Sequence, residues 1–169
     1  ERKLNTNPIL LVAPDDGAFP YVREAAKLLK RYIQDEYGID IEVYSGYMVK
    51  TRISGTEAKV EGYILGEDGK AINSVGNIDI SKCWTFVIDD ETSWGTTLLA
   101  ATYALVRELG VSWQRVLTGV VHGKLAQGLK PFETGWNKEE IKTASEPKPE
   151  YINEIKGLMP PRLFVCTES

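Results

Sequence analysis

Cysteine, histidine and long hydrophobic runs are scarce in this sequence. Its 169 residues include two cysteines, Cys83 and Cys166, and one histidine, which argues against a disulfide framework or a Cys/His zinc site and predicts buried thiols. No stretch approaches the ~18 apolar residues of a membrane span, and the polar start lacks the hydrophobic segment of a signal peptide. We therefore expect a cytoplasmic protein that makes no membrane contact.

A concentrated excess of positive charge is also missing. The formal net charge is -4, which argues against a surface built to hold nucleic acid, so any anionic ligand must be bound locally. Neither G-x-x-x-x-G-K-[ST] nor G-x-G-x-x-G occurs, which argues against a Walker-type or a dinucleotide site. With 43% hydrophobic residues, the length suits one compact domain over 1–169.

Apolar runs alternate with amphipathic stretches along the chain. This order is typical of an α/β fold, and we expect a mostly parallel open sheet of about five strands with helices on both faces. Helical spacing predicts one helix from Pro20 to a stop at Gly38 and a second from Leu98 to Gly110. The expected strands are 9–13, 39–44, 59–65, 84–88, 115–121 and 163–166.

Two polar stretches show no sustained periodicity. Residues 45–58 contain two glycines, Lys50 and Arg52, and we expect them to form a long flexible loop. Residues 124–161 are richer in charge, proline and glycine, and we expect a variable segment with a short helix near 151–156.

Asp89 and Asp90 are adjacent carboxylates at the end of the apolar strand 84–88, and a hydroxyl-rich turn that opens a helix follows them. Ligands of open α/β sheets bind at that edge. Carboxylates accept paired hydrogen bonds from vicinal hydroxyls, while turn hydroxyls and free helix amides can hold a phosphate. This pattern suits a sugar phosphate. The alternative is that both acids only cap the following helix.

The stretch VIDDETSWGTT resembles the phosphoribosyl pyrophosphate signature of the phosphoribosyltransferase fold. The resemblance is closest to the C-terminal half of ribose-phosphate pyrophosphokinase and covers approximately Pro8 to Gly123 plus the last strand. It implies a type I-like fold, Mg²⁺ as cofactor, and ribose 5-phosphate or phosphoribosyl pyrophosphate as ligand. Asp89 and Asp90 would bind the ribose. The residues implied in 5-phosphate binding are Thr92, Ser93, Gly95, Thr96 and Thr97.

The same resemblance implies two further groups of site residues. The loop PDDGAF resembles the family's pyrophosphate-binding loop, where a glycine lets amides approach the anion. Lys50 and Arg52 resemble the basic pair on the family's flexible catalytic loop, which closes over the pyrophosphoryl group. The pyrophosphate-binding residues would be Asp15, Asp16, Gly17 and Ala18. His122 resembles part of a His-Gly step and is expected to have no catalytic role.

This chain also departs from the family pattern. Trp94 stands where the family generally has Thr, which removes a phosphate-facing hydroxyl, and Ala18 or Phe19 replaces the usual second glycine of the pyrophosphate loop. The family takes much of its ATP site from an N-terminal half that this sequence does not contain. A phosphorelay receiver domain is a rival interpretation, but its late strand should end in Lys, and here it ends in His122.

Three functions fit these observations. The first is a ribose-phosphate pyrophosphokinase-like protein, here its half that binds ribose 5-phosphate with magnesium, with ATP as second substrate. The second is a stand-alone phosphoribosyltransferase, which joins ribose 5-phosphate to a nitrogenous base selected by residues 124–161. The third is a non-catalytic sensor of phosphoribosyl pyrophosphate or a partner subunit, which Trp94 would permit. We also expect a homo-oligomer.

Overall fold

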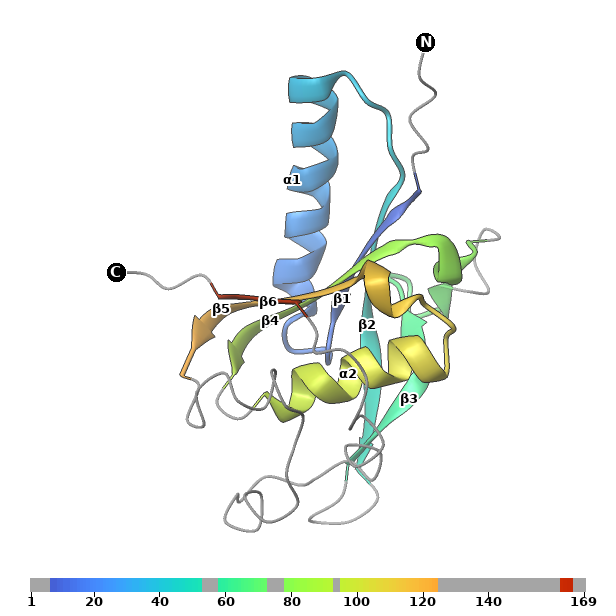
Figure 1. Cartoon of the computed structure of the whole chain (residues 1–169), viewed down its shortest axis with the longest axis vertical. Helices are drawn as coiled ribbons and strands as arrows, with labels where there is room; N and C mark the ends of the chain where they lie inside the picture. Colours follow the sequence, from blue (N-terminus) through green and yellow to red (C-terminus); the bar gives the residue numbers. More distant parts are fainter. Residues whose placement is uncertain (1–6, 53–57, 73–77, 93–94, 125–161, 166–169) are drawn as a thin grey trace.

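The computed structural model describes residues 7–52, 58–72, 78–92, 95–124 and 162–165, with the backbone alone at 50–52, 58–63, 96, 107 and 162–163. These described residues form one six-stranded sheet with two α-helices (Figure 1). The short helix expected near 151–156 lies outside the described residues.

The sheet confirms the predicted α/β class. Its strand order is β3-β2-β1-β4-β5-β6, and every neighbouring pair is parallel except β2 with β3. The strands are β1 (Ile9–Ala13), β2 (Val43–Arg52), β3 (Ala58–Leu65), β4 (Trp84–Thr92), β5 (Val116–Gly123) and β6 (Arg162–Val165). The helices are α1 (Phe19–Tyr37) and α2 (Thr96–Arg107).

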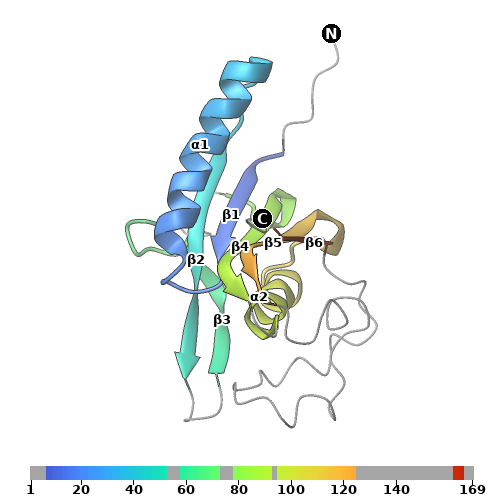
Figure 2. The same ribbon diagram turned by 90° about the vertical axis from the view of Figure 1, so that its left-hand side faces the viewer.

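The two helices lie on opposite faces of the sheet, as predicted (Figure 2). Because successive side chains of a strand point to opposite faces, β1 contributes to two separate cores. Leu10 and Val12 pack in the cluster that contains the buried residues of α2. Leu11 and Ala13 pack with Val22 and the rest of the buried side of α1. The near-continuous apolar sequence of β1 follows from this burial on both sides.

The predicted ends of α1 agree with the structure better than those of α2. A proline stands in the first turn of α1, and the left-handed Gly38, at φ 64°, donates its amide to Gln34 and ends the helix as expected. Helix α2 ends at Arg107, earlier than predicted. Gly110 does adopt the expected left-handed conformation, at φ 69°, but the helix has already ended.

The loop predicted over residues 45–58 is wrong for 45–52, which belong to β2, and for Ala58, which begins β3. The strand also starts at Val43 instead of residue 39. The misleading signal was Gly46, because a Cβ atom there would lie 2.5 Å from side-chain atoms of Ile64 and Ile72. This glycine marks close packing inside the sheet and not a turn. Residues 53–57 lie outside the described part.

Strand β4 continues to Thr92, four residues beyond the predicted end. Asp89 to Thr92 are therefore the last residues of a strand and not part of a loop. Pairing with β5 explains the extension, since Asp89 pairs with Val120 and Glu91 with His122.

The expected burial of the first cysteine is confirmed. Cys83 is fully buried, and burial raises the pKa of its thiol, while Cys166 lies outside the described residues. Neither α1 nor α2 combines the length and the apolar character that crossing a bilayer requires, and this holds for the described part of the chain.

Candidate functional site

The carboxyl ends of β1, β4 and β5 meet at one edge of the sheet, because the three strands are parallel neighbours. A cavity of about 260 Å³ opens there, and we call it the edge cavity. It brings the start of α1, the predicted acid pair and the end of β5 together. The lining residues are Ala18, Tyr21, Val22, Ile88, Asp89, Asp90, Val121 and His122.

The two acids at the end of β4 have different surroundings. Asp89 continues the buried alternation of the strand and is 9% exposed, whereas Asp90 is exposed. The Asp90 amide donates to Asp89 Oδ1 at 3.0 Å, and the Glu91 amide donates to Asp90 Oδ1 at 2.8 Å. Both bonds stay within the strand. These bonds do not support the hypothesis that the two acids only cap the following helix. In the described part of the chain, the N-cap residue of α2 is Gly95, and its amide donates to Thr92 and not to either acid.

Of the acids at this site, Asp89 has a strongly raised pKa. Its pKa is raised from 3.8 to about 7, first by burial and then by the negative charges of Asp15 and Asp90, while the hydrogen bond from the Asp90 amide opposes the shift. Among the described side chains, no basic group forms an ion pair with Asp15, Asp89 or Asp90. Near neutral pH, Asp89 is therefore a mixture of carboxylate and carboxylic acid and can both accept and donate hydrogen bonds.

The turn between β4 and α2 offers donors for an anion. Buried Thr92 accepts the Gly95 amide on Oγ1 at 3.1 Å, and Gly95 adopts a left-handed φ of 73°. The amides of the first helical turn have no partner within the helix. Of the predicted 5-phosphate residues, Thr92, Gly95 and half-buried Thr97 lie at this turn. Ser93 lies outside the described residues, as does the Thr96 side chain.

The loop between β1 and α1 differs from this turn in the burial of its residues and in its hydrogen bonds. Asp15 is half-buried, Asp16 and Gly17 are exposed, and Ala18 is buried. The Gly17 amide donates to Asp15 Oδ1 at 3.1 Å, so this amide is already satisfied inside the loop. Gly17 is not among the left-handed glycines. The role of this loop in binding pyrophosphate stays a prediction.

Lys50 and Arg52, the predicted catalytic pair, lie in a strand and not in a loop. Their backbones pair with Val60 and Ala58 of β3. Strand β2 pairs with β1 only as far as Tyr47, so both positions belong to a two-stranded extension that continues past the end of β1 (Figure 1). The side chains of Lys50 and Arg52 are outside the described part, and their catalytic role stays a prediction.

Sequence reasoning missed Lys124 as a neighbour of the acid-bearing strand. Its Nζ lies 2.6 Å from Glu91 Oε1, and its amide donates to the Thr92 carbonyl at 3.0 Å. The sequence did offer one indication of this contact. Lys124 directly follows His122-Gly123, at the carboxyl end of β5, which is a neighbour of β4. The bond to Thr92 connects the end of β5 to the end of β4, just before the turn that leads into α2.

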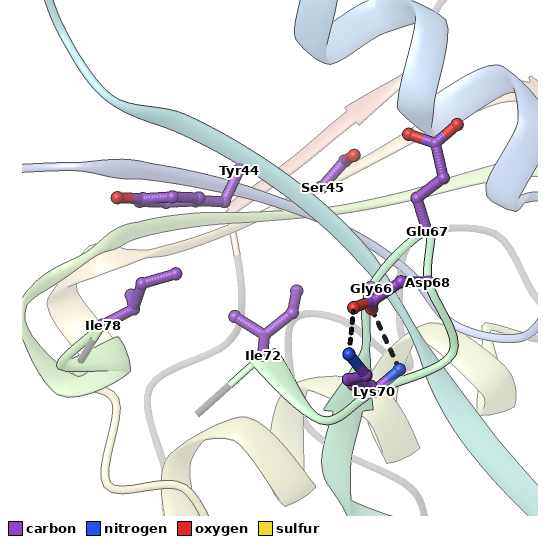
Figure 3. Close-up of a pocket in the computed structure, with 8 residues that line it drawn as sticks. All are labelled: Tyr44, Ser45, Gly66, Glu67, Asp68, Lys70, Ile72 and Ile78. Carbon is purple, nitrogen blue, oxygen red and sulfur yellow. Dashed lines mark hydrogen bonds and ion pairs between the residues drawn. The ribbon is translucent and has the colours of Figure 1, made fainter. Parts of the chain in front are cut away.

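A larger cavity of about 390 Å³ lies away from this edge, between the start of β2 and the turn after β3 (Figure 3). Tyr44 and Ile78 form its apolar side, and Lys70 bonds to Asp68 at its rim. Ile72 and Ile78 bound residues 73–77, which lie outside the described part. We therefore assign no site to this cavity.

Comparisons with known proteins give little beyond this geometry. No family model and no curated protein matches the chain. Among solved structures, the chain is similar to adenine phosphoribosyl transferase from Trypanosoma brucei, solved in complex with AMP, pyrophosphate and ribose-5-phosphate. The identity is 15% and the TM-score 0.38, over 96% of this chain and 58% of that chain. A similarity of this size assigns no function, and the chain spans less than two thirds of the length of that protein.

Proposed function

We propose that this chain binds a 5-phosphorylated ribose at the carboxyl edge of its sheet, as a phosphoribosyltransferase-like protein. Asp89 and Asp90 bind the ribose hydroxyls, and the turn from Thr92 to Gly95 binds the phosphate. One observation carries the proposal: a buried acid at the end of β4 is followed, within the same short stretch, by an uncapped helix start. The two ends of a ribose phosphate match these two features.

Binding of the ribose hydroxyls depends on the protonation state of Asp89. An ionised carboxylate accepts hydrogen bonds from two vicinal hydroxyls, and such bonds favour the charged form. Because the pKa of Asp89 is raised to about 7, binding the sugar should lower it and release a proton. Affinity for the ribose should therefore increase as the pH rises through neutrality.

Binding of the 5-phosphate depends mainly on backbone amides. The amino end of a helix carries unsatisfied amides and the positive end of the helix dipole, and both favour an anion. The Thr92 hydroxyl, which accepts from Gly95, can still donate its own proton to a phosphate oxygen. These groups supply phosphate binding without a basic side chain, in agreement with the net negative charge.

A divalent cation fits the acid cluster when it is shared with the ligand. The described side chains contain no group of three or more acids, histidines or cysteines that could hold a metal by themselves. Asp15, Asp89 and Asp90 nevertheless gather negative charge that would repel a pyrophosphate. Mg²⁺ commonly binds through substrate oxygens, waters and one or two carboxylates. Asp89 and Asp90 would hold it through the sugar, where it would neutralise pyrophosphoryl charge.

Two reactions use such a site. A pyrophosphokinase-like protein transfers a pyrophosphoryl group from ATP to ribose 5-phosphate, and a transferase joins the ribose of phosphoribosyl pyrophosphate to a base. In both, the protein mainly positions and neutralises the reacting groups. The third candidate, a sensor, needs only the binding step. The positions of Asp89, Thr92 and Gly95 support the binding step, which all three candidates share.

The test is calorimetric titration of the protein with ribose 5-phosphate in the presence of Mg²⁺. We expect Asp90→Asn to weaken binding roughly tenfold or more, because a charge-assisted hydrogen bond is lost. Asp40→Asn, an exposed acid at the opposite end of the sheet, is the matched control and should leave binding unchanged. Equal affinity of the Asp90 variant and the wild type would remove the acid pair from the site.

Product assays then separate the candidate reactions. The protein is incubated with ribose 5-phosphate, ATP and Mg²⁺, and separately with phosphoribosyl pyrophosphate and a panel of nucleobases. Turnover with ATP selects the pyrophosphokinase, and turnover only with a base selects the transferase. Binding without turnover selects the sensor.

A further inference from the structure

Lys124 connects the end of β5 to the end of β4 through two separate contacts. Its amide donates to the Thr92 carbonyl at 3.0 Å, which extends the pairing of the two strands beyond Gly123. Its Nζ lies 2.6 Å from Oε1 of Glu91. The backbone bond fixes this residue beside Thr92, where the turn into α2 begins. The ion pair holds its ammonium group at the residue just before that turn.

Strand geometry places the ion pair on the face of the sheet that carries α2. Glu91 pairs with His122, and Lys124 follows His122 by two residues, so strand alternation directs their side chains to one face. Val120, two residues before His122, packs in the core that contains the buried residues of α2. The ammonium group of Lys124 is therefore on the side of the strands where α2 begins.

A phosphate bound at the start of α2 would lie near several negative charges. Asp90 and Glu91 are exposed, and Asp89 precedes them in the same strand. A phosphate monoester carries a charge of about −1.5 to −2 at pH 7, whereas the amino end of a helix supplies the equivalent of roughly +0.5 elementary charge. The helix amides can position the phosphate, but they do not neutralise it. An ammonium group would supply the remaining positive charge.

The ion pair between Lys124 and Glu91 can exchange for a stronger one. The side chains are 63% and 47% exposed, and an exposed ion pair contributes little because water competes for both groups. A phosphate offers more negative charge than one carboxylate and forms strong charge-assisted hydrogen bonds. Lysine carries its charge on a flexible four-carbon stem, so the ammonium group can turn while the backbone stays in place.

We propose that Lys124 is a ligand of the 5-phosphate and that Glu91 holds it beside the turn before the ligand binds. When ribose 5-phosphate binds, the ammonium group leaves Glu91 for a phosphate oxygen, while the bond from its amide to Thr92 is kept. Lys124 thereby favours phosphorylated ribose over ribose itself. This inference rests on the proposed function, because it requires the 5-phosphate to lie at this turn.

Calorimetric titration with ribose 5-phosphate in the absence of Mg²⁺ tests the proposal. We expect Lys124→Gln to weaken binding roughly tenfold, because a charge-assisted hydrogen bond is lost, and Lys124→Arg to keep most of the affinity. Lys82→Gln is the matched control. Lys82 is also exposed and forms an ion pair with Asp79 at 2.9 Å, but it lies before the amino end of β4, and its replacement should leave binding unchanged.

Competition by inorganic phosphate shows which end of the ligand Lys124 contacts. The inhibition constant of phosphate against ribose 5-phosphate should rise in Lys124→Gln by a factor similar to the loss of ribose 5-phosphate affinity. In Asp90→Asn, phosphate should compete as well as before or better, because a negative charge is removed. A Lys124→Gln variant that loses affinity for ribose 5-phosphate but not for phosphate would overturn the assignment. Far-ultraviolet circular dichroism checks that each variant folds.

A double-mutant cycle tests the role of Glu91. Glu91→Gln should strengthen binding about threefold, because Lys124 is released and a negative charge is lost. The gain should shrink in the Lys124→Gln background, where only the loss of charge remains. Equal gains in both backgrounds would overturn the holding role of Glu91.

The same titrations separate this inference from the proposed function. If Lys124→Gln binds ribose 5-phosphate as tightly as the wild type while Asp90→Asn binds it less tightly, Lys124 is not a phosphate ligand and the proposed function stands. A wild type without affinity for ribose 5-phosphate would overturn both.

Discussion

The two turns at the carboxyl edge of the sheet look alike in sequence but differ in the structure. Each follows a parallel strand with paired acids and leads into a helix through a glycine. At the end of β4, Asp89 is buried and Asp90 is exposed, and Gly95 in the following turn is left-handed. After β1, Asp15 is half-buried and Asp16 is exposed, and Gly17 is not left-handed. Burial and backbone conformation, not composition, distinguish the two turns.

This difference suggests a division of labour at the candidate site. The turn after β4 offers uncapped helix amides and can hold a phosphate without a metal. The loop after β1 adds the Asp15 carboxylate to the acid pair and closes its Gly17 amide onto that carboxylate. An anion bound at the loop after β1 would be repelled by the negative charge of Asp15 and of the acid pair. We therefore expect pyrophosphate binding, but not 5-phosphate binding, to require Mg²⁺.

The largest effect should come from replacing the buried acid. Because the pKa of Asp89 is raised from 3.8 to about 7, the folded state keeps a proton that the unfolded chain loses between these values. The contribution of Asp89 to stability is therefore highest below pH 4 and falls until the pH exceeds 7, by up to about 4 kcal/mol. Asp89→Asn should remove this loss and stabilise the protein at pH 8 while weakening ribose-phosphate binding.

Urea unfolding of the wild type and of Asp89→Asn from pH 4 to pH 8 measures this effect. The free energy of unfolding should fall with pH more steeply in the wild type than in the variant. Asp16→Asn, the exposed acid of the other turn, should keep the wild-type pH dependence. If Asp89→Asn and the wild type show parallel pH profiles, the buried carboxylate is not the titrating group.

A smaller effect is expected at the hydrogen bond between Thr92 and Gly95 in the turn that joins β4 to α2. Thr92→Val keeps the side-chain shape but leaves the Gly95 amide without its acceptor, which should cost about 1–3 kcal/mol because the site is buried. Thr92→Ser should retain most of the stability. In the other turn, Asp15→Ala removes the acceptor of the exposed Gly17 amide, and water can replace it. Chemical unfolding of the three variants tests whether the Thr92→Val loss exceeds both others.

The sequence predicted those parts of the fold that depend on local periodicity. Apolar runs located β1 and the first part of β4, and the proline and the glycine at its two ends located α1. It could not predict that β2 continues through Gly46, because that extension depends on antiparallel pairing with β3 and on packing against Ile64. These contacts join residues that are distant in the sequence, and a local pattern does not contain them.

The candidate site shows the same division. The acid pair and the threonine turn were predicted from residue type and from their position after a strand, and the structure places Asp89, Thr92 and Gly95 at the expected edge. The raised pKa of Asp89 was not predictable, since it requires burial and the approach of Asp15 from another loop. The pairing of Lys124 with Glu91 likewise arises from strand register.

The smallest effect is expected from replacing the glycines of the two turns, Gly95 and Gly17, by alanine. Gly95 has a φ of 73°, where an L-residue is disfavoured by about 1–2 kcal/mol. Gly17 lies outside that region, and an added Cβ would meet only the flexible Asp15 carboxylate, at 3.3 Å. Gly95→Ala should therefore destabilise the protein by about 1 kcal/mol, whereas Gly17→Ala should be neutral or stabilising by about 0.5 kcal/mol. Equal losses in thermal unfolding would show that both turns need a glycine, and the structural contrast between them would fail.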